Sequence, residues 1–432
     1  MTSEGYECSK KSVLNSVGWR ITDIDSVTQV IGGGTPSTKN SKYWGGGIPW
    51  ITPKDLSGYS YRYITHGERN ITEDGLKNSS AKLIPKNSIL LTTRAPIGYL
   101  AIAKIEVTTN QGIHSLVPND NVSPLFLYYL LKNNIEYLKS NANGSTFGEL
   151  SQSSLEQLHF AFPELDEQIK IAKILSDLDS KIELNQQMNK TLESIAQTLF
   201  KHWFIDFEFP NENGQPYKSG GGEMVDSELG EIPKNWRVSI FSQAIKVNPE
   251  RKMSKGKFTK KISMSDLDPW QSWIKKWNYE SYTSGSKFKN GDTLFARITP
   301  SLEHGKTAMV HLLDEDEIGY GSTEFIVFGR KEIKSDVYIF NLCRSDYIRT
   351  AAIGSMTGTS GRQRVPNYLF DQLLIVVPPE ELINFYDRIV LQFFRRVFVN
   401  ASEIHSLIQI KDSLLPKLLS GKISVPVGDT NE

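Results

Sequence analysis

Two long segments of the chain carry an amphipathic pattern typical of helices that pair with each other. In residues 163–207, apolar side chains recur at alternating spacings of three and four residues, which is the heptad pattern of a coiled-coil seam. The pattern predicts one helix from about Glu164 to about Phe204. The predicted seam positions are Ile171, Leu175, Leu178, Ile182, Asn185, Leu192 and Leu199, with Asn189 and Ala196 between them.

The same seam occurs a second time, 215 residues further along the chain. Residues 378–419 repeat the apolar spacing, and Asn400 matches Asn185. A polar residue inside a seam fixes the register of two helices at some cost in stability. Each helix is therefore the predicted partner of the other, with Asn185 near Asn400. The second seam consists of Tyr386, Val390, Phe393, Val397, Asn400, Ile404, Leu407 and Leu414, with Lys411 as a further polar position.

An antiparallel pairing is predicted because a segment of mixed pattern precedes each helix. In a parallel pair, residues 208–235 would have to run back along the whole helix. A helix of roughly 36 residues is about 54 Å long, whereas a flexible linker of about 26 residues typically spans about 25–30 Å. Residues 208–235 contain three consecutive glycines and three prolines, which predicts a linker with little structure of its own.

Short apolar runs bounded by turn residues precede each predicted helix and indicate strands. Examples are Ile89–Thr93 and Leu100–Ile105, and a helix is predicted over Pro124–Leu138. Gly32–Gly34 and Gly45–Gly47 are predicted as loops, since neither has the GxGxxG spacing of a nucleotide-binding turn.

Short motifs in these mixed segments also occur twice. Trp19-Arg20 reappears as Trp236-Arg237, and Asp55-Leu56 as Asp266-Leu267, at offsets that vary while the helices keep theirs. One duplication with variable loops explains this pattern. The predicted fold class is α+β: two pseudo-twofold-related α/β domains joined by two long antiparallel helices that form a coiled coil. The predicted boundaries are 1–17 for an N-terminal lead-in, 18–162 for the first domain, 163–207 for the first helix, 208–235 for the linker, 236–377 for the second domain, 378–419 for the second helix and 420–432 for a tail.

The composition, with 39% hydrophobic and 23% charged residues, is ordinary for a globular protein. No run of eighteen apolar residues is present, and the N-terminus lacks the apolar core of a signal peptide. Two cysteines, Cys8 and Cys343, are too few for a disulfide framework or a zinc site. These features predict a cytoplasmic protein without membrane association.

The formal net charge is zero, but the charges are unevenly distributed. Residues 36–104 contain ten Lys and Arg against four Asp and Glu, and residues 246–306 contain thirteen against six. Residues 164–208 contain five against nine. Two basic segments therefore flank an acidic one, which is compatible with a polyanionic partner.

No catalytic constellation is visible in the sequence. Gly305-Lys306-Thr307 resembles the end of a phosphate-binding loop, but Pro300 stands where the first glycine belongs. Neither HExxH nor GxSxG occurs. Asp268-Pro269-Trp270 is one proline short of the loop common in methyltransferases that modify bases, and is predicted to be a turn. We therefore predict no catalytic residue, no cofactor and no metal site.

Both basic segments are interleaved with aromatic residues, as in surfaces that bind nucleic acid. Arg94 and Arg297 are favoured, because both follow a predicted strand at the same place in the repeat. The loop 358–364 contains two arginines, whereas its counterpart 144–150 has none. A DNA contact by this loop is therefore predicted in the second half only. The predicted DNA-binding residues are Lys39, Tyr43, Trp44, Lys54, Arg62, Arg69, Arg94, Lys255, Lys257, Lys260, Lys261, Lys275, Lys276, Arg297, Arg362 and Arg364.

Several motifs give the chain a family resemblance. They are Gly34-Thr35-Pro36-Ser37, the stretch from Ile48 to Leu56, the stretch from Leu199 to Phe207, the linker stretch from Asn211 to Tyr217, and the stretch from Leu414 to Ile423. With these, residues from about 19 to about 423 resemble the specificity subunit of a Type I restriction-modification system. In the second half, the first two motifs survive only as residues 262–267. The second domain should therefore read a different sequence.

The resemblance implies a DNA-binding subunit without catalysis of its own. Each target-recognition domain would read one half of a bipartite site in double-stranded DNA, and the helices would act as a ruler between them. Two methyltransferase subunits and the restriction and translocase subunits would be separate chains. Two alternatives stay open at this point: a DNA methyltransferase or nuclease with an unfamiliar active site, and a coiled-coil adaptor without a DNA role.

Overall fold

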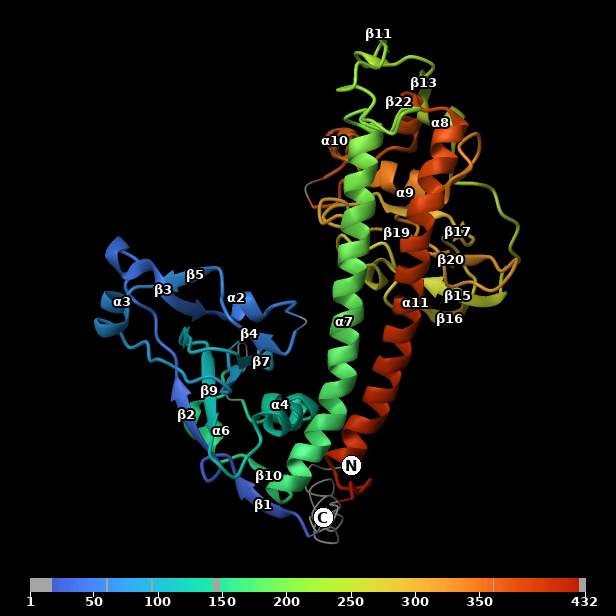
Figure 1. Cartoon of the computed structure of the whole chain (residues 1–432). Coiled ribbons are helices and arrows are strands. Elements are labelled where there is room, and N and C mark those ends of the chain that lie inside the picture. The colour runs from blue at the N-terminus through green and yellow to red at the C-terminus, as the bar shows by residue number, and fades with distance from the viewer. Residues whose placement is uncertain (1–17, 60, 95, 143–147, 360, 427–432) are drawn as a thin grey trace. The chain divides into compact units, whose positions relative to one another are not determined.

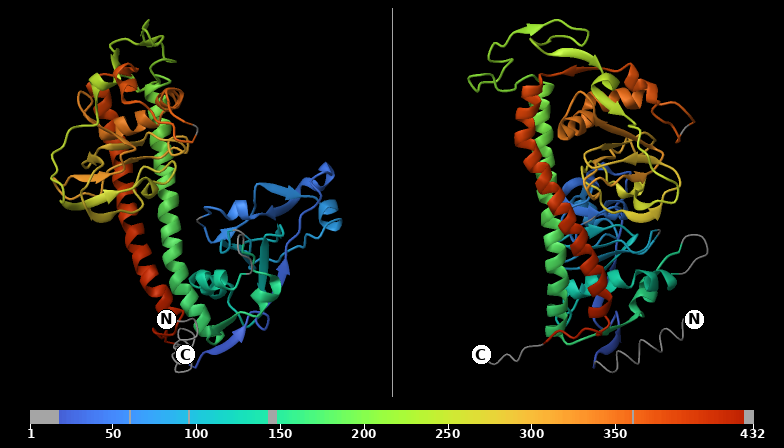
Figure 2. Two further views of the ribbon diagram at one scale, coloured as in Figure 1. Left: turned by 180° about the vertical axis from the view of Figure 1, so that it is seen from behind. Right: turned by 90° about the vertical axis from the view of Figure 1, so that its right-hand side faces the viewer.

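The computed structural model describes residues 18–59, 61–94, 96–142, 148–359 and 361–426. The predicted lead-in 1–17 and part of the predicted tail lie outside these residues. The chain divides into two compact units, residues 1–183 with 407–432 and residues 184–406. In each unit, an α/β part flanks portions of two long helices (Figures 1 and 2).

The two long helices are α7 (Leu165–Phe204) and α11 (Glu380–Leu418). Their first residues are 215 apart, so the predicted duplication of the helix is confirmed. Both begin with acidic residues in the first turn, where the N-terminal end of the helix dipole favours negative charge.

Both units show that α7 and α11 pack antiparallel. In the second unit, the Tyr386 hydroxyl donates a hydrogen bond to the carbonyl oxygen of Ala196 at 3.1 Å. In the first unit, Lys411 Nζ lies 2.6 Å from Asp179 Oδ1. Within the second unit, Asn400 bonds to Asn189 whereas Tyr386 bonds to Ala196, so positions that rise along one helix fall along the other, as predicted.

The predicted heptad register holds only in part. Ile171, Leu175, Ile182, Asn185, Tyr386, Val390, Val397, Asn400 and Ile404 are buried. By contrast, Leu178, Leu192, Leu199, Phe393, Leu407 and Leu414 are only partly buried. Asp179, Glu193 and Phe200 are buried immediately after three of these positions.

Burial along α7 recurs every eleven residues, at Ile171, Ile182, Glu193 and Phe204. Eleven residues in three turns give about 3.67 residues per turn, which is closer to the value of an unstrained α-helix than the roughly 3.5 residues per turn of a heptad.

Three buried asparagines make polar contacts between the helices in the second unit. Asn400 Nδ2 donates to Asn189 Oδ1 at 2.8 Å, and Asn185 Nδ2 donates to Glu403 Oε2 at 2.9 Å. The predicted burial of Asn185 and Asn400 is therefore confirmed. The hydrogen-bond partner of Asn400, however, is Asn189, one turn further along α7 than Asn185.

The first unit contains two sheets in addition to the strand pair β1–β10. The larger sheet has the order β2-β9-β6-β7-β4 and the smaller one the order β5-β3-β8. The strands are β1 (Arg20–Asp23), β2 (Thr28–Gly32), β3 (Trp44–Ile51), β4 (Tyr63–Ile64), β5 (Arg69–Ile71), β6 (Ile89–Thr92), β7 (Leu100–Ala103), β8 (Thr108–Thr109), β9 (Ile113–Pro118) and β10 (His159–Phe162). The short helices are η1 (Ser41–Tyr43), α2 (Pro53–Leu56), α3 (Glu73–Lys77), α4 (Pro124–Asn133), α5 (Ile135–Ser140) and α6 (Gln152–Glu156).

Helix α4 joins the larger sheet to α7 in the first unit (Figure 1). Its buried residues Phe126, Leu127 and Leu131 belong to one apolar cluster with Ile171 and Leu175 of α7. Leu418 and Leu419, at the end of α11, complete this cluster. The core of the first domain is therefore continuous with the start of one long helix and the end of the other.

The second unit repeats this organisation with other strands. Its larger sheets have the orders β14-β21-β18-β19 and β16-β15-β20-β17, and β13 pairs with β22. The strands are β11 (Met224–Val225), β12 (Ile232–Pro233), β13 (Arg237–Ile240), β14 (Ile245–Val247), β15 (Phe258–Ile262), β16 (Asn278–Ser281), β17 (Ser286–Phe288), β18 (Thr293–Ala296), β19 (Thr307–Met309), β20 (Gly319–Gly321), β21 (Phe325–Arg330) and β22 (Leu374–Val377). The short helices are α8 (Phe241–Ala244), η2 (Met264–Asp266), α9 (Asp336–Arg344), α10 (Asp346–Gly354) and η3 (Asn367–Asp371).

The two domains share a common core topology although their sequences differ, and each adds one strand of its own, β4 in the first and β17 in the second. The order β2-β9-β6-β7 corresponds to β14-β21-β18-β19, with antiparallel pairing throughout. In the second sheet, β3 pairs parallel with β8, and β15 pairs parallel with β20. Each domain starts and ends with an antiparallel strand pair at the entrance to its long helix, β1–β10 and β13–β22. The duplication predicted from short motifs thus extends to the strands that form the core of both sheets.

Three local predictions are wrong. The predicted helix 124–138 is interrupted at Asn134, which separates α4 from α5. Gly45–Gly47 belong to β3 and form an irregularity in its pairing with β5, where a side chain on Gly46 would meet the backbone of Ile71. Residues 208–235 are ordered by turns, by the β11–β12 pair, and by Phe209, whose ring stacks on Tyr217 and Trp236.

The buried asparagine pair gives a stability prediction. Replacing Asn400 by Ala leaves the Asn189 side chain buried without its partner, so we expect the free energy of unfolding to fall by about 1–3 kcal/mol. The double variant Asn189→Leu/Asn400→Leu should recover most of this loss, because both polar groups are removed together. Chemical denaturation measures both effects. Asn384→Ala, at an exposed position of α11, is the matched control, and an equal loss in control and Asn400→Ala would contradict the prediction.

Candidate nucleic-acid interface

In the first domain, strands β3 and β5 hold an arginine against two tryptophans. The guanidinium carbon of Arg69 lies 3.5 Å from the centre of the Trp44 ring, and Trp44 contacts Trp50 edge-on at 4.9 Å. Trp50 is buried and donates from Nε1 to the carbonyl oxygen of Gly34 at 3.0 Å. Arg69 is exposed and Trp44 is half-buried, so this cluster presents a flat cationic face to solvent.

The 3-10 helix η1 precedes this cluster and carries two more predicted contacts. Asn40 caps it by accepting a hydrogen bond from the Lys42 backbone. Lys39 is exposed beside it, and Tyr43 is half-buried.

Two other predicted cations of the first domain are exposed but paired. Lys54 Nζ lies 2.7 Å from Glu68 Oε2, and Arg94 Nε lies 2.8 Å from Glu149 Oε1. Exposed ion pairs of this kind contribute little to stability and exchange readily for other partners. Lys54 and Arg94 therefore remain accessible to an anionic ligand.

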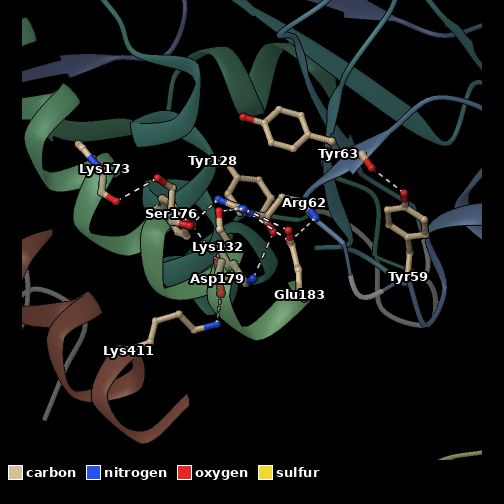
Figure 3. A network of polar contacts seen from close by, with 12 residues as sticks. Tyr59, Arg62, Tyr63, Tyr128, Lys132, Lys173, Ser176, Asp179, Glu183 and Lys411 are labelled. Atoms are coloured by element: carbon tan, nitrogen blue, oxygen red, sulfur yellow. Dashed lines mark hydrogen bonds and ion pairs between the residues drawn. The ribbon is translucent and has the colours of Figure 1, made fainter. Parts of the chain in front are cut away.

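Arg62 and Lys260 are wrong predictions, because both side chains are buried and saturated by acidic partners. Arg62 contacts α7 through Glu183 at 3.1 Å (Figure 3). Burial alone would lower the pKa of Arg62, but its interactions with Glu183 and Tyr129 together outweigh that effect and raise the pKa. Lys260 lies 2.9 Å from Glu317 and 3.0 Å from Asp314. A pattern of basic residues in the sequence does not show whether each one pairs with an acidic residue of its own chain or with DNA.

In the second domain, strands β15 and β16 lie at one edge of the sheet β16-β15-β20-β17 and carry exposed aromatic residues. Phe258 is 68% and Tyr279 is 50% exposed, and their rings stack at 5.8 Å. Lys255 and Lys257 are exposed just before β15. Phe258 was not predicted from the sequence, because a single phenylalanine beside lysines is equally typical of a core strand.

Strand β15 itself and the turn before β16 supply further cations. Lys261 Nζ lies 2.7 Å from Glu280 Oε2, and Lys275 Nζ lies 3.3 Å from Asp268 Oδ2. Lys276 is exposed next to Lys275.

Arg297, Arg362 and Arg364 come together around one loop. Arg364 forms an ion pair with Glu324 at 2.6 Å, and the backbone of Arg297 donates to the carbonyl oxygen of Glu324 at 3.0 Å. Arg297 is half-buried, and burial lowers the pKa of its guanidinium. Arg362 is exposed at the tip of the loop. The structure therefore brings three predicted cations together although 65 residues separate Arg297 from Arg362.

Arg94 and Arg297 occupy equivalent places in the two domains, as predicted. Each follows the central strand of its larger sheet, β6 in one domain and β18 in the other. Both lie near a glutamate, Glu149 for Arg94 and Glu324 for Arg297. The equivalence concerns position only, since Arg94 is exposed and Arg297 is half-buried.

Trp270, predicted as part of a turn and as one of the aromatic residues in the second basic segment, is exposed. It is 49% exposed and adopts a φ of 61°, and the Arg349 guanidinium lies 4.1 Å from its ring centre. Gly305 has no side chain to displace this ring, since a Cβ there would lie 2.7 Å from it.

In the described part of the chain, no helix is long and apolar enough to cross a membrane. The same residues contain no group of three or more His, Cys, Asp or Glu that could hold a metal ion.

Comparison with known proteins identifies the family. The family model of the Type I restriction modification DNA specificity domain matches residues 16–194. The specificity subunit of the Type I restriction enzyme MjaIX from Methanocaldococcus jannaschii is 36% identical over 94% of this chain and 94% of its own length. The HindI specificity subunit of Haemophilus influenzae is 25% identical over 71% of this chain and 79% of its own.

A solved structure agrees on the fold. The S subunit of a Type I restriction-modification system from M. genitalium superimposes with a TM-score of 0.56 over 94% of this chain and 96% of its own, at 16% identity. Together with the near full-length match to the MjaIX subunit, this shows that the chain belongs to the family of Type I restriction enzyme specificity subunits, the non-catalytic chains that give these complexes their DNA sequence specificity.

Proposed function

We propose that this specificity subunit reads an asymmetric bipartite site in double-stranded DNA, one half with each domain, while α7 and α11 set the gap between the halves. It acts in a cytoplasmic complex with two methyltransferase subunits, which restriction and translocase subunits join. The observation that carries the proposal is that one topology occurs twice, each time with exposed cations and aromatic residues but with different side chains.

The difference between the two surfaces supports an asymmetric target. The first domain presents Arg69 stacked on Trp44, whereas the second presents Phe258 and Tyr279 beside lysines. The exposed side chains at the β15–β16 edge of their sheet could enter the major groove of B-DNA, where base edges are distinguishable. Exposed lysines next to this edge suit the flanking phosphates. Different side chains on equivalent strands read different bases.

Exposed apolar residues on the long helices support the docking of two like partners. Leu184 on α7 is 57% and Val399 on α11 is 58% exposed, and the two positions are 215 residues apart in the duplication. Ile195 and Ile410, 46% and 47% exposed, form a second such equivalence. An exposed apolar position that occurs in both helices suits a partner that binds twice.

The double variant Leu184→Arg/Val399→Arg should therefore reduce co-purification of the methyltransferase subunit.

The DNA contacts are tested one domain at a time. We expect Lys257→Ala to weaken DNA binding and to reduce the slope of log affinity against log salt by about one, because one phosphate contact is lost. Arg69→Ala should weaken discrimination at the half-site of the first domain and leave the other half-site unchanged. Fluorescence anisotropy of the methyltransferase-bound complex at several salt concentrations measures both. Lys139→Ala, an exposed residue paired with Glu136, is the control, and a variant indistinguishable from it would not contact DNA.

The spacing function is tested by lengthening both helices. An insertion of 22 residues adds about 33 Å, close to the roughly 34 Å of one DNA turn. It also equals two of the eleven-residue repeats, so each helix keeps its buried face. Inserted after Gln187 in α7 and after Ala401 in α11, it leaves Asn185 with Glu403 and Asn189 with Asn400. We expect the methylated motif to keep both half-sites and its gap to grow by about ten base pairs.

An eleven-residue insertion at the same two places is the matched control. It keeps the helix faces but adds only about 16 Å, about half a DNA turn, so the two domains should face opposite sides of the duplex. Methylation of bipartite sites should then be lost. An unchanged gap with 22 inserted residues, or altered half-site sequences, would contradict the role of the helices as a spacer.

A further inference from the structure

A buried polar junction joins the first domain to the long helices within the first unit (Figure 3). Arg62 enters it from the segment between α2 and β4, and its side chain is only 6% exposed. The guanidinium donates to both carboxylate oxygens of Glu183 at 3.1 Å, to Ser180 Oγ at 2.7 Å and to the carbonyl oxygen of Ser176 at 3.1 Å. One arginine therefore contacts three successive turns of α7.

A second set of contacts extends the junction to α4 and α11. Asp179, one turn before Glu183, accepts a hydrogen bond from the Tyr129 hydroxyl at 2.8 Å and from Lys411 Nζ at 2.6 Å. The Asp179 and Lys411 side chains are 8% and 15% exposed. Two cations thus face two carboxylates in the junction, and its charges are balanced.

The junction is better suited to fixing geometry than to adding stability. Removing charges from water offsets much of the gain from their pairing, so an apolar contact of the same size would stabilise the unit about as well. An apolar contact, however, tolerates sliding and rotation. The planar fork of an arginine on a carboxylate does not, because its parallel hydrogen bonds form in one orientation only.

In the second unit, a buried carboxylate of the same helix also meets an arginine, through a longer single contact and without the fork of Arg62 on Glu183. The backbone of Ser272 donates to Glu193 Oε1 at 3.0 Å, and Arg344 Nη1 lies 3.7 Å from Glu193 Oε2. Both charged side chains are almost fully buried, at 6% and 7% exposure. Arg344 also donates to the carbonyl oxygen of Trp270 at 2.9 Å, which ties the exposed Trp270 turn to α7.

We propose that Arg62 with Glu183, and Arg344 with Glu193, are positioning residues that hold each recognition domain at one place and one angle on α7, and so determine how strictly the complex rejects DNA with a wrong gap. This inference rests on the proposed reading of a bipartite site. The helix lengths set the preferred gap, whereas the junctions set the tolerance around it. Loosening a junction lets its domain follow a half-site displaced by one base pair.

The test measures gap tolerance in the full complex with the methyltransferase subunits. After the target has been mapped, methylation rates are compared on duplexes with the native gap and with gaps one base pair shorter and longer. We expect Arg62→Ala and Glu183→Gln to reduce the discrimination against the altered gaps by about tenfold or more, with a smaller change on the native gap. Arg62→Lys should restore part of the discrimination, because a single ammonium keeps the charge but not the fork.

Lys139→Ala, which removes an exposed ion pair of the same unit, should keep wild-type discrimination. Wild-type discrimination in a folded, assembled Arg62→Ala complex would overturn the inference and leave the proposed function intact. If the Arg62→Ala complex does not assemble, Glu183→Gln decides, because it keeps the size and polarity of the side chain. A wild-type complex without any gap preference would overturn the proposed function, and this inference with it.

Discussion

The packing of α7 against α11 is the constraint on which the rest of the structure depends. Each helix passes through both compact units, and in each unit the globular part shares its core with them. In the second unit, Tyr386 packs against Phe200 and Trp203 and bonds to Ala196, so the aromatic core of the domain is also the helix interface. A change in the helix register would therefore disturb the domain core as well.

Duplication explains how one scaffold carries two different surfaces. The strand orders around β6 and β18 coincide, and the helices keep a constant offset, because these parts form the core. The exposed side chains on β3, β5, β15 and β16 have no such role and are free to diverge. The proposed recognition of two half-sites would therefore need no change of fold, only different side chains at equivalent strand positions.

Elements with a regular spacing of buried apolar residues were predicted well from the sequence, whereas the partners of charged residues were not. The helix bounds, β6 and β7 follow from apolar periodicity. The eleven-residue spacing was missed because Asp179 and Glu193 are polar, and their burial depends on Tyr129, Lys411, Ser272 and Arg344, which are distant in sequence. For the same reason Arg62 and Lys260 were assigned to DNA. The exposure of Phe258 and Trp270 was found only in the structure, because neighbouring residues in the sequence do not show whether an aromatic side chain is exposed.

The proposed function requires that each domain reads one half of the target independently of the other. Mapping of methylated bases by sequencing, in a host that expresses this chain with its methyltransferase subunit, tests it most directly when residues 18–162 are exchanged for the corresponding domain of another family member. We expect an asymmetric bipartite motif with a fixed gap, in which the exchange alters one half-site and leaves the other unchanged. One continuous motif, or a change in both half-sites, would contradict it.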